Sequence, residues 1–492
     1  MKEQLRNRFV GPVKEFSQDV SWRNFFGWRT LGFTLERAWI YLLFLDATSS
    51  FMTWNGESIQ DFVYIGSSIV LATVLIVSAV ARQHIKRFVS SPRFSILGAI
   101  FATIGTLAIS SSPAPGLTGI ISGVLGAFLT GFGSAIIMLS YGEIYRNVNS
   151  VKTVVEVSAA VFLAALVFLL VGFLPRVIGC IVCALLPLAS GWILVFKLKV
   201  WTPRLGMPDA TPVIKIGAFT TRIGACACLV GLADGVVRAV FMNATEMSAQ
   251  EFYQYPLPVA SFITLLILCL CQAFTAENGL RQTYRAVVFI MASFFMLLPV
   301  FTDVSGLERV ISLTGYGTFN ALIWVILADI AYRYRFSALA VFGIGWGMVT
   351  VGALLGSIVG QMVCVFAPFS PQQISLIAFL ATLAILVSYL FVFNESNLAD
   401  LAKKPSEGEE AVIEPSYQRF QRRCKIAAEI YGLTPRETEI MILAAKGRTG
   451  ARIQEELFLS RGTVTTHLRH IYQKMDVHSK QELLDVIERV SE

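Results

Sequence analysis

Residues 256–276 read PLPVASFITLLILCLCQAFTA, a run of 21 residues without a charged side chain. An apolar helix of about 20 residues spans the hydrocarbon core of a bilayer. Similar runs recur along the first 394 residues, so the sequence predicts an all-α membrane bundle of about twelve spans. The expected spans are 31–52, 62–81, 95–112, 117–141, 154–174, 177–196, 217–240, 256–276, 286–302, 310–331, 337–361 and 374–394.

The charges of the chain are unevenly distributed. The 492 residues are 55% hydrophobic and carry a net charge of +7. Residues 1–394 hold 25 basic and 17 acidic groups, whereas residues 395–492 hold 15 and 16. This contrast excludes an ordinary soluble protein and indicates one part in lipid and one in water. The predicted segments are a basic N-terminal segment at 1–30, a membrane domain at 31–394, a flexible acidic linker at 395–418 and a soluble domain at 419–492.

Lysine and arginine gather in alternate connections between the spans. Of the 25 basic residues in the first 394, 20 lie in connections on the same side as the N-terminal segment. Cytoplasmic loops carry such an excess, so we expect this side to be the cytoplasmic one. An even number of spans places both termini in the cytoplasm. The sequence thus predicts a multi-pass protein of the cytoplasmic membrane.

The spans form two groups of six, separated by a longer basic loop at about 197–215. Leu45-Asp46 in the first span echoes Ala233-Asp234 in the seventh, at an offset of 188 residues. This 6+6 layout resembles the major facilitator superfamily, which implies a fold of two repeats. The Gly and Asp-Arg signature of that family is missing from the loop after the second span, which reads RQHIKRFVS at 82–90. Its absence argues against coupled transport.

We single out six charged residues inside the apolar runs, where each costs about 2.5–3.5 kcal/mol at the bilayer centre on insertion scales. Such groups must pair or line a water-filled cavity. One interpretation is a ligand pocket in which Arg37 or Arg238 binds an anionic group and Asp46 or Asp234 a cationic one. The other is a set of structural ion pairs. The six residues are Glu36, Arg37, Asp46, Arg222, Asp234 and Arg238.

Small and sulfur-containing residues in the spans have simpler interpretations. The glycine repeats at 119–123, 343–347 and 352–360 permit close packing of helices, either within one chain or between two copies. Seven of the eight cysteines lie in apolar runs, which favours a role as small hydrophobic side chains. Cys180 and Cys183 have the spacing of a redox or metal pair but no histidine near them. We expect no metal site, no cofactor and no enzymatic activity.

The soluble domain opens with a helix signal. Thr434 can cap a helix that starts at Pro435, and Glu437 follows three residues after the cap, which is the spacing of a capping box. Ile440, Leu443 and Ala444 give this helix an apolar side, and Gly447 ends it. A second helix is expected after Thr449, buried through Ile453 and Leu457.

A third helix is predicted after Ser460, its capping residue. Its apolar residues recur at spacings of four, three and four, as one buried face requires. The opposite face carries hydroxyl, amide and guanidinium groups, which is typical of a helix that reads the major groove of DNA. A merely solvated face is the alternative. The buried set is Val464, Leu468, Ile471 and Met475, and the outer set is Thr465, Thr466, Arg469 and Gln473, flanked by Arg461 and Lys474.

With these residues in place, the segment resembles the LuxR-type helix-turn-helix family. Leu433-Thr434-x-Arg436-Glu437-x-Glu439 opens the motif, and the positions that follow in register are Gly447, Ile453, Leu457, Leu459-Ser460, Thr463-Val464, His467, Ile471, Lys474 and Val477. The family often has lysine at the position of Thr465 and alanine at that of Gln454, so base preference and the contact between helices can differ here.

The LuxR resemblance implies roles for the third and fourth helices. Thr465, Thr466 and Arg469 align with base-reading positions. Lys474 and His467 align with positions that contact or support the phosphate backbone, and packing is the other option for His467. A fourth helix at about 479–490 would form a dimer on DNA. The full expected DNA-binding set is Arg461, Thr463, Thr465, Thr466, His467, Arg469, Gln473 and Lys474.

These features predict a membrane-bound one-component transcription regulator. Its membrane domain would sense an unidentified small molecule, and its soluble domain would bind double-stranded DNA. The 24 residues of the linker at 395–418 are too few for a phosphate-receiving domain. The alternative is a major-facilitator-like transporter that carries a regulatory DNA-binding tail.

Overall fold

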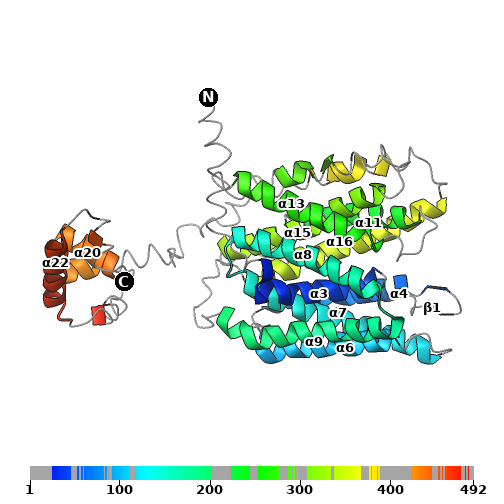
Figure 1. The fold of residues 1–492 in the computed structure, drawn as a ribbon, viewed down its shortest axis with the longest axis horizontal. Coiled ribbons are helices and arrows are strands. Elements are labelled where there is room, and N and C mark those ends of the chain that lie inside the picture. The colour runs from blue at the N-terminus through cyan, green and yellow to red at the C-terminus, as the bar shows by residue number, and fades with distance from the viewer. Residues whose placement is uncertain are drawn as a thin grey trace. The chain divides into compact units, whose positions relative to one another are not determined.

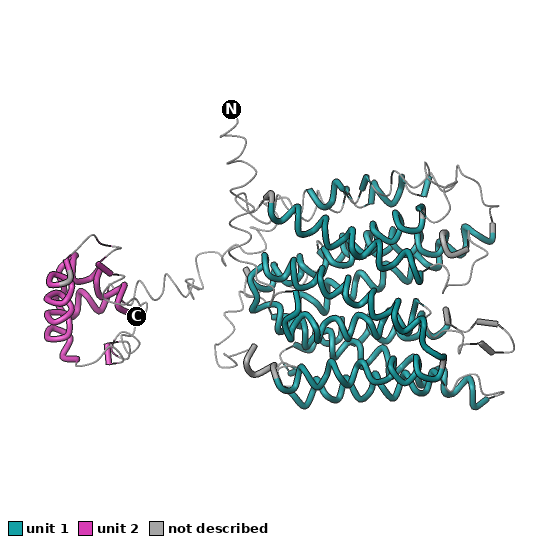
Figure 2. Tube along the Cα trace, viewed as in Figure 1, with its two compact units in different colours: residues 1–404 teal, residues 405–492 magenta. Residues whose placement is uncertain are grey.

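The computed structural model divides into two compact units, Met1–Lys404 and Pro405–Glu492 (Figure 2). The longer described segments are 25–45, 60–82, 91–110, 117–201, 223–243, 253–275, 307–333, 337–366, 426–445 and 460–477. Shorter described pieces are 53–54, 57–58, 84–85, 286–290, 292–293, 296, 376–377, 379–384, 386–387, 424, 453–454, 457, 482–483 and 486.

The first unit is a bundle of long helices (Figure 1). Within its described residues, eight helices are long and apolar enough to cross a membrane. The prediction of an all-α, multi-pass membrane bundle is confirmed. The long helices are α3 (Trp28–Phe44), α4 (Gln60–Val80), α6 (Pro92–Ser110), α7 (Leu117–Tyr145), α8 (Ser150–Gly172), α9 (Arg176–Trp201), α11 (Ala225–Asn243), α13 (Pro256–Thr275), α15 (Leu307–Arg333) and α16 (Ala338–Phe366).

Some details differ from the expected spans. The first helix, α3, starts three residues early and ends at Phe44, and a short antiparallel hairpin, β1 (Thr53–Trp54) with β2 (Glu57–Ser58), precedes α4. Helix α7 extends four residues beyond the expected 141, since a helix can continue past the apolar core into the polar interface. The spans expected at 286–302 and 374–394 are described only in pieces, so the count of twelve reaches beyond the described residues.

Contacts between the helices follow the order expected of two repeats. In the first half α3 packs on α8 and α4 on α7, and the matching pairs of the second half are α11 with α16 and α13 with α15. The two halves meet where α4 packs on α16 and α8 packs on α13. A two-fold operation that exchanges the halves converts each of these pairs into the other. The 6+6 arrangement therefore appears in the packing as well as in the loop lengths.

Glycines hold α11 and α16 against each other. A Cβ atom on Gly352 or Gly356 of α16 would overlap a backbone carbonyl oxygen of α11, and one on Gly231 or Gly235 of α11 would overlap a carbonyl oxygen of α16. Glycine is needed here because only a residue without a side chain lets the two backbones touch. The repeat at 352–360 thus packs within one chain, which is one of its two expected uses.

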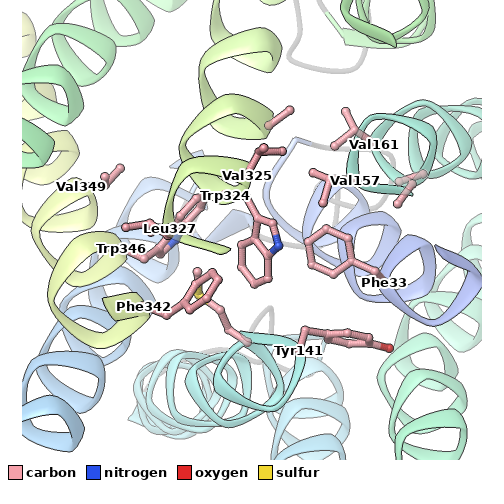
Figure 3. Packing of buried hydrophobic residues seen from close by; sticks show 14 of the residues in the cluster. Phe33, Tyr141, Val157, Val161, Trp324, Val325, Leu327, Phe342, Trp346 and Val349 are labelled. Carbon is pink, nitrogen blue, oxygen red and sulfur yellow. The ribbon is translucent and has the colours of Figure 1, made fainter. Parts of the chain in front are cut away.

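Aromatic side chains from both halves meet in one cluster (Figure 3). Trp324 of α15 lies between Phe33 of α3 and Phe342 of α16, with both ring centroids 4.7 Å away. Trp346 and Tyr145 contact the same indole from two further sides. We call these five residues the aromatic cluster. It draws on the first halves of α3 and α16, the end of α7 and the second half of α15, so it lies in one half of the bundle along its length.

Replacing Gly356 with valine should disrupt the packing of α11 on α16. A larger side chain at this position meets backbone, which cannot rotate away as a side chain can. The free energy of unfolding should therefore fall by at least the roughly 1–3 kcal/mol typical of overpacking. The measurement is the thermal unfolding temperature of the detergent-purified protein. Leu355→Val is the matched control, because Leu355 is an exposed neighbour on the same helix. Equal unfolding temperatures for the two variants would contradict the packing described.

Candidate functional site

Helix α20 (Pro435–Ala445) of the second unit starts with the expected capping box. The backbone N–H of Glu437 donates to Thr434 Oγ1 at 3.3 Å, and the backbone N–H of Thr434 donates to Glu437 Oε2 at 2.8 Å. These reciprocal bonds satisfy two amides that a helix start leaves unpaired. The chain turns at Gly432, two residues before Thr434, with a positive φ of 62° that glycine adopts without strain.

Helix α22 (Arg461–Lys474) is the expected third helix, with Ser460 as its cap. Ser460 Oγ accepts the backbone N–H of Thr463 at 3.2 Å. Val464, Ile471 and Met475 are almost completely buried, and they join Ile440 and Met441 in the core of the unit. The predicted buried face of this helix is therefore confirmed, with Leu468 partly buried beside it.

The opposite face of α22 is exposed. It presents the side chains of Thr465, Thr466, Arg469 and Gln473 to solvent. Thr463 is partly buried, and its hydroxyl hydrogen-bonds with Ser460 Oγ at 2.8 Å, so it serves the cap. The side chain of Arg461 lies outside the described residues. The polar face can thus reach a groove without any rearrangement of its own helix.

Lys474 lies at the end of α22 but points into its own unit. Its Nζ donates to Glu437 Oε2 at 2.7 Å and to the carbonyl oxygen of Gly432 at 3.1 Å. The expected backbone contact with DNA competes with these two bonds. In this structure Lys474 joins the end of the exposed helix to the start of α20, which is a supporting role. The sequence could not indicate this pair, because 37 residues separate Lys474 from Glu437.

The histidines of α22 differ in their surroundings. His467 is partly buried, and its Nδ1 has no hydrogen-bond partner within the described part of the chain. His470, which the sequence analysis did not single out, is exposed, and its Nδ1 atom lies 3.9 Å from Glu437 Oε1.

Arg436, which precedes Glu437 on α20, contacts a residue outside its own helix. Its Nη2 donates to the carbonyl oxygen of Leu457 at 3.0 Å.

The pKa of Glu437 reflects this network. Burial acts to raise it, but the hydrogen bond from Lys474 and those from Thr434 outweigh burial and lower the pKa to about 2. The carboxylate is therefore charged at any physiological pH. It holds the start of α20 and the end of α22 together.

In the membrane unit, Arg37 has a partner that was not expected. Its guanidinium donates to both carboxylate oxygens of the adjacent Glu36, at 2.5 and 2.7 Å. It also lies over the rings of Phe33, Trp324 and Trp346, at 5.1–5.9 Å from their centroids. For Arg37 the structural ion pair thus describes the geometry. Asp46, which was expected in the pocket, and the charged residue Arg222 lie outside the described residues.

Asp234 and Arg238 of α11 are arranged differently. The Arg238 Cζ lies 4.0 Å from the centroid of the Tyr64 ring on α4. Tyr253, Tyr316 and Asp234 are further electrostatic neighbours of this guanidinium. Tyr316 also interacts with Arg37, so the structure places the charged residues of the two halves around one tyrosine. Nothing in the sequence spacing indicated the tyrosines.

Two carboxylates in the spans were missed by the sequence analysis. Glu156 of α8 accepts two hydrogen bonds from Arg29 of α3, at 2.6 and 3.0 Å. Asp329 of α15 accepts a hydrogen bond from the buried Ser150 at the start of α8, which joins the two halves. The available signal was their position, since both fall inside the expected spans at 154–174 and 310–331.

The two units together define a class of protein, a multi-pass membrane protein with a helix-turn-helix DNA-binding domain. Residues 432–487 match the family described as bacterial regulatory proteins, luxR family. The chain is also 37% identical over 89 residues to the response regulator protein VraR of Staphylococcus epidermidis, and 36% identical over 88 residues to VraR of Staphylococcus aureus. Each match covers 18% of this chain and spans only 42% of the length of the relative.

The membrane unit is similar to solved transporter structures. A bacterial homologue of iron transporter ferroportin, outward-facing with soaked iron, gives a TM-score of 0.55 at 13% identity and covers 78% of this chain and 100% of that one. A second outward-facing structure of such a homologue gives 0.54 at 13% identity, with 77% and 99% covered. The major facilitator superfamily transporter FucP in the outward conformation gives 0.48 at 11% identity, with 78% and 100% covered.

These comparisons confirm two predictions. The C-terminal unit is a LuxR-type helix-turn-helix domain, and the N-terminal unit has a transporter-like membrane fold, as the first two structural likenesses show. At 13% identity the structural likeness concerns the fold alone.

The stability of the C-terminal unit should depend on pH through Glu437. Its folded-state pKa lies below the ordinary value of 4.5, so its contribution is fully present above about pH 4.5 and is lost as the pH falls towards about 2. Urea unfolding of residues 405–492 between pH 2 and 6 measures this loss. Glu437→Gln should remove that part of the pH dependence, whereas Glu439→Gln, at an exposed position, should keep it. Parallel curves for the parent and Glu437→Gln would disprove the role of the carboxylate.

Proposed function

We propose that this protein is a membrane-bound one-component transcription regulator. The observation that carries the proposal is that one chain joins a LuxR-type DNA-binding domain to a multi-pass membrane unit with a transporter-like fold. A DNA-binding domain acts where DNA is, so both it and the N-terminal segment lie in the cytoplasm. The membrane unit is the sensor of a small molecule, and its occupancy controls binding to double-stranded DNA.

In this proposal the exposed face of α22 enters the major groove. Arg469 pairs with a guanine edge, which is the commonest specific contact of arginine, and Thr465 and Thr466 contact neighbouring bases. Gln473 and Arg461 lie at the sides of the contact, and Thr463 and His467 support the helix near the phosphates. Lys474 supports the domain from inside. Two copies bind a two-fold site through the fourth helix, as the family resemblance implies.

The sensor function is supported by charges that a bilayer makes costly. Arg37, Asp234 and Arg238 lie where the two halves of the bundle meet, around Tyr316. Intramembrane ionisable groups of this kind mark ligand or ion sites. The proposed pocket comprises these three residues and Asp46.

The second candidate function is a transporter with a regulatory DNA-binding tail. The transporter-like fold of the membrane unit favours it. The missing signature in the loop at 82–90 favours the sensor instead. The two functions differ in whether any solute crosses the membrane, so they are separable by experiment.

Arg469→Ala should weaken binding to DNA from the protein's own locus. Loss of a bidentate base contact costs about 1–3 kcal/mol, or roughly 5- to 150-fold in affinity, and relaxes the preference at one base pair. Electrophoretic mobility shifts at a fixed salt concentration measure it. Glu429→Ala is the control, since Glu429 is exposed and lies outside α22. Unchanged affinity in Arg469→Ala, or no sequence preference in the parent, rules out the proposed reading face.

Deletion of residues 419–492 separates the two candidate functions. For a regulator, the deletion abolishes the ligand-dependent change in transcription of target promoters. Neither the intact chain nor the deleted chain then moves a solute across the membrane. Promoter-bound DNA mapped with and without candidate molecules measures the first effect. Solute uptake or efflux that persists after the deletion would instead establish the transporter.

A further inference from the structure

The charges of the membrane unit differ in how they are neutralised. Arg37 is bound by Glu36, and Arg29 is bound by Glu156. Among the residues that the structure describes, by contrast, no carboxylate forms an ion pair with Arg238 and no cation forms one with Asp234. Both side chains are partly accessible although they lie in the middle of a helix inside the bundle. These two groups are instead each other's electrostatic neighbours on one helix.

Asp234 and Arg238 are placed to act on one small molecule. They are four residues apart on α11, so they lie on the same side of the helix, separated by about 6 Å along its axis. The guanidinium is held over the face of Tyr64, which positions it without neutralising it. Tyr253 and Tyr316 border the same group. We call Tyr64, Tyr253 and Tyr316 the tyrosine group.

The tyrosine group and the aromatic cluster occupy opposite halves of the bundle along its length, and Arg37 is a neighbour of both. Tyr64 is near the start of α4, Tyr253 directly precedes α13, and Tyr316 lies in the first half of α15. The aromatic cluster lies at the end of α15 and the start of α16. Because successive spans run in opposite directions, these positions lie in two different halves of the bundle along its length. The positive-inside expectation assigns the half with the aromatic cluster to the cytoplasmic side, which places the charged pair in the outer half.

We propose that Asp234 and Arg238 form a recognition site for a compact zwitterion, an α-amino acid being its simplest form. Arg238 binds the carboxylate or a similar anionic group, Asp234 binds the ammonium group, and the tyrosine group contacts the body of the ligand. This inference rests on the proposed sensor function and specifies its ligand class. The ligand of the sensor is then a solute of the outer side.

The charge balance of the site favours a zwitterion over singly charged molecules. Asp234 and Arg238 together have no net charge, so a zwitterion compensates both groups and leaves none unpaired. A simple amine leaves Arg238 without a counter-charge, and a simple acid leaves Asp234 without one. An unpaired charge in a site screened from water is penalised, which is the basis of discrimination here.

Binding to the full-length protein in lipid nanodiscs tests the site. Three ligand bodies are each used in three charge forms: the amino acids phenylalanine, tyrosine and leucine, the amines phenethylamine, tyramine and isoamylamine, and the acids 3-phenylpropionate, 3-(4-hydroxyphenyl)propionate and 4-methylpentanoate. Calorimetry gives the affinity, and thermal unfolding followed by tryptophan fluorescence reports stabilisation. We expect at least one amino acid to bind tenfold or more tightly than its matched amine and acid.

Variants assign the two charges. Asp234→Asn should reduce amino-acid affinity to that of the matched acid, and Arg238→Gln should reduce it to that of the matched amine. Lys152→Gln, which removes a charge elsewhere, should leave all affinities unchanged. If a variant fails to fold, the affinities of the nine probes for the parent protein still test the proposal. The proposal is overturned if an amine or acid binds as tightly as its amino acid, if none of the nine probes binds, or if both variants retain the preference.

A transcription reporter separates this inference from the proposed function. A reporter that still responds to its inducer in both Asp234→Asn and Arg238→Gln preserves the sensor and removes the site. Amino-acid binding with the expected charge preference, but without any effect on transcription, preserves the site and removes the sensor.

Discussion

Inside a bilayer, a charged side chain has to be compensated within the protein, and this constraint shapes the membrane unit. Glu36 and Arg37 are adjacent in the chain and neutralise each other. The guanidinium of Arg37 also lies over rings of the aromatic cluster. Glu156 and Arg29 meet it between two helices of the first half. Asp329 and Ser150 use the same principle across the two halves. The last two contacts join different helices, where apolar packing alone distinguishes poorly between lipid and protein neighbours.

The features that the sequence predicted well are local in the chain. Apolar runs, the capping box at Thr434 and the cap at Ser460 each depend on residues within a few positions, and each is present in the structure. The buried face of α22 was also readable, since its period follows from helix geometry alone. For the same reason the exposure of Thr465 and Arg469 could be anticipated.

The features that escaped prediction depend on contacts distant in sequence or on a choice between neighbours. The sequence left open whether Arg37 binds a ligand or forms a structural ion pair, and in the structure the adjacent Glu36 binds it directly. Tyr64 lies under Arg238 although 174 positions separate them, and no pattern on either helix indicates this. Lys474 has the positive charge expected of a phosphate contact, yet in the structure it donates a hydrogen bond to Glu437 on another helix. Only the packed structure decides among such options.

Helix α22 is fixed at both of its ends. Ser460 holds the first turn, and Lys474 holds the last turn to Glu437 and Gly432. The exposed face is thus oriented before any nucleic acid is present, so little ordering cost falls on binding. With ten acidic and thirteen basic groups in residues 419–492, the domain has only a small charge excess for general attraction to DNA. Orientation is then the larger contributor to selectivity.

The glycine contacts between α11 and α16 have a mechanical consequence. Where backbone lies directly on backbone, one helix cannot advance along the other by even a single residue rise, about 1.5 Å, without its carbonyl groups colliding with the facing chain. The pair therefore moves as one rod. Its first member carries Arg238, and its second carries Trp346 and Phe342 in the aromatic cluster. The guanidinium of Arg238 and two rings of the aromatic cluster therefore belong to one pair of helices whose backbones touch.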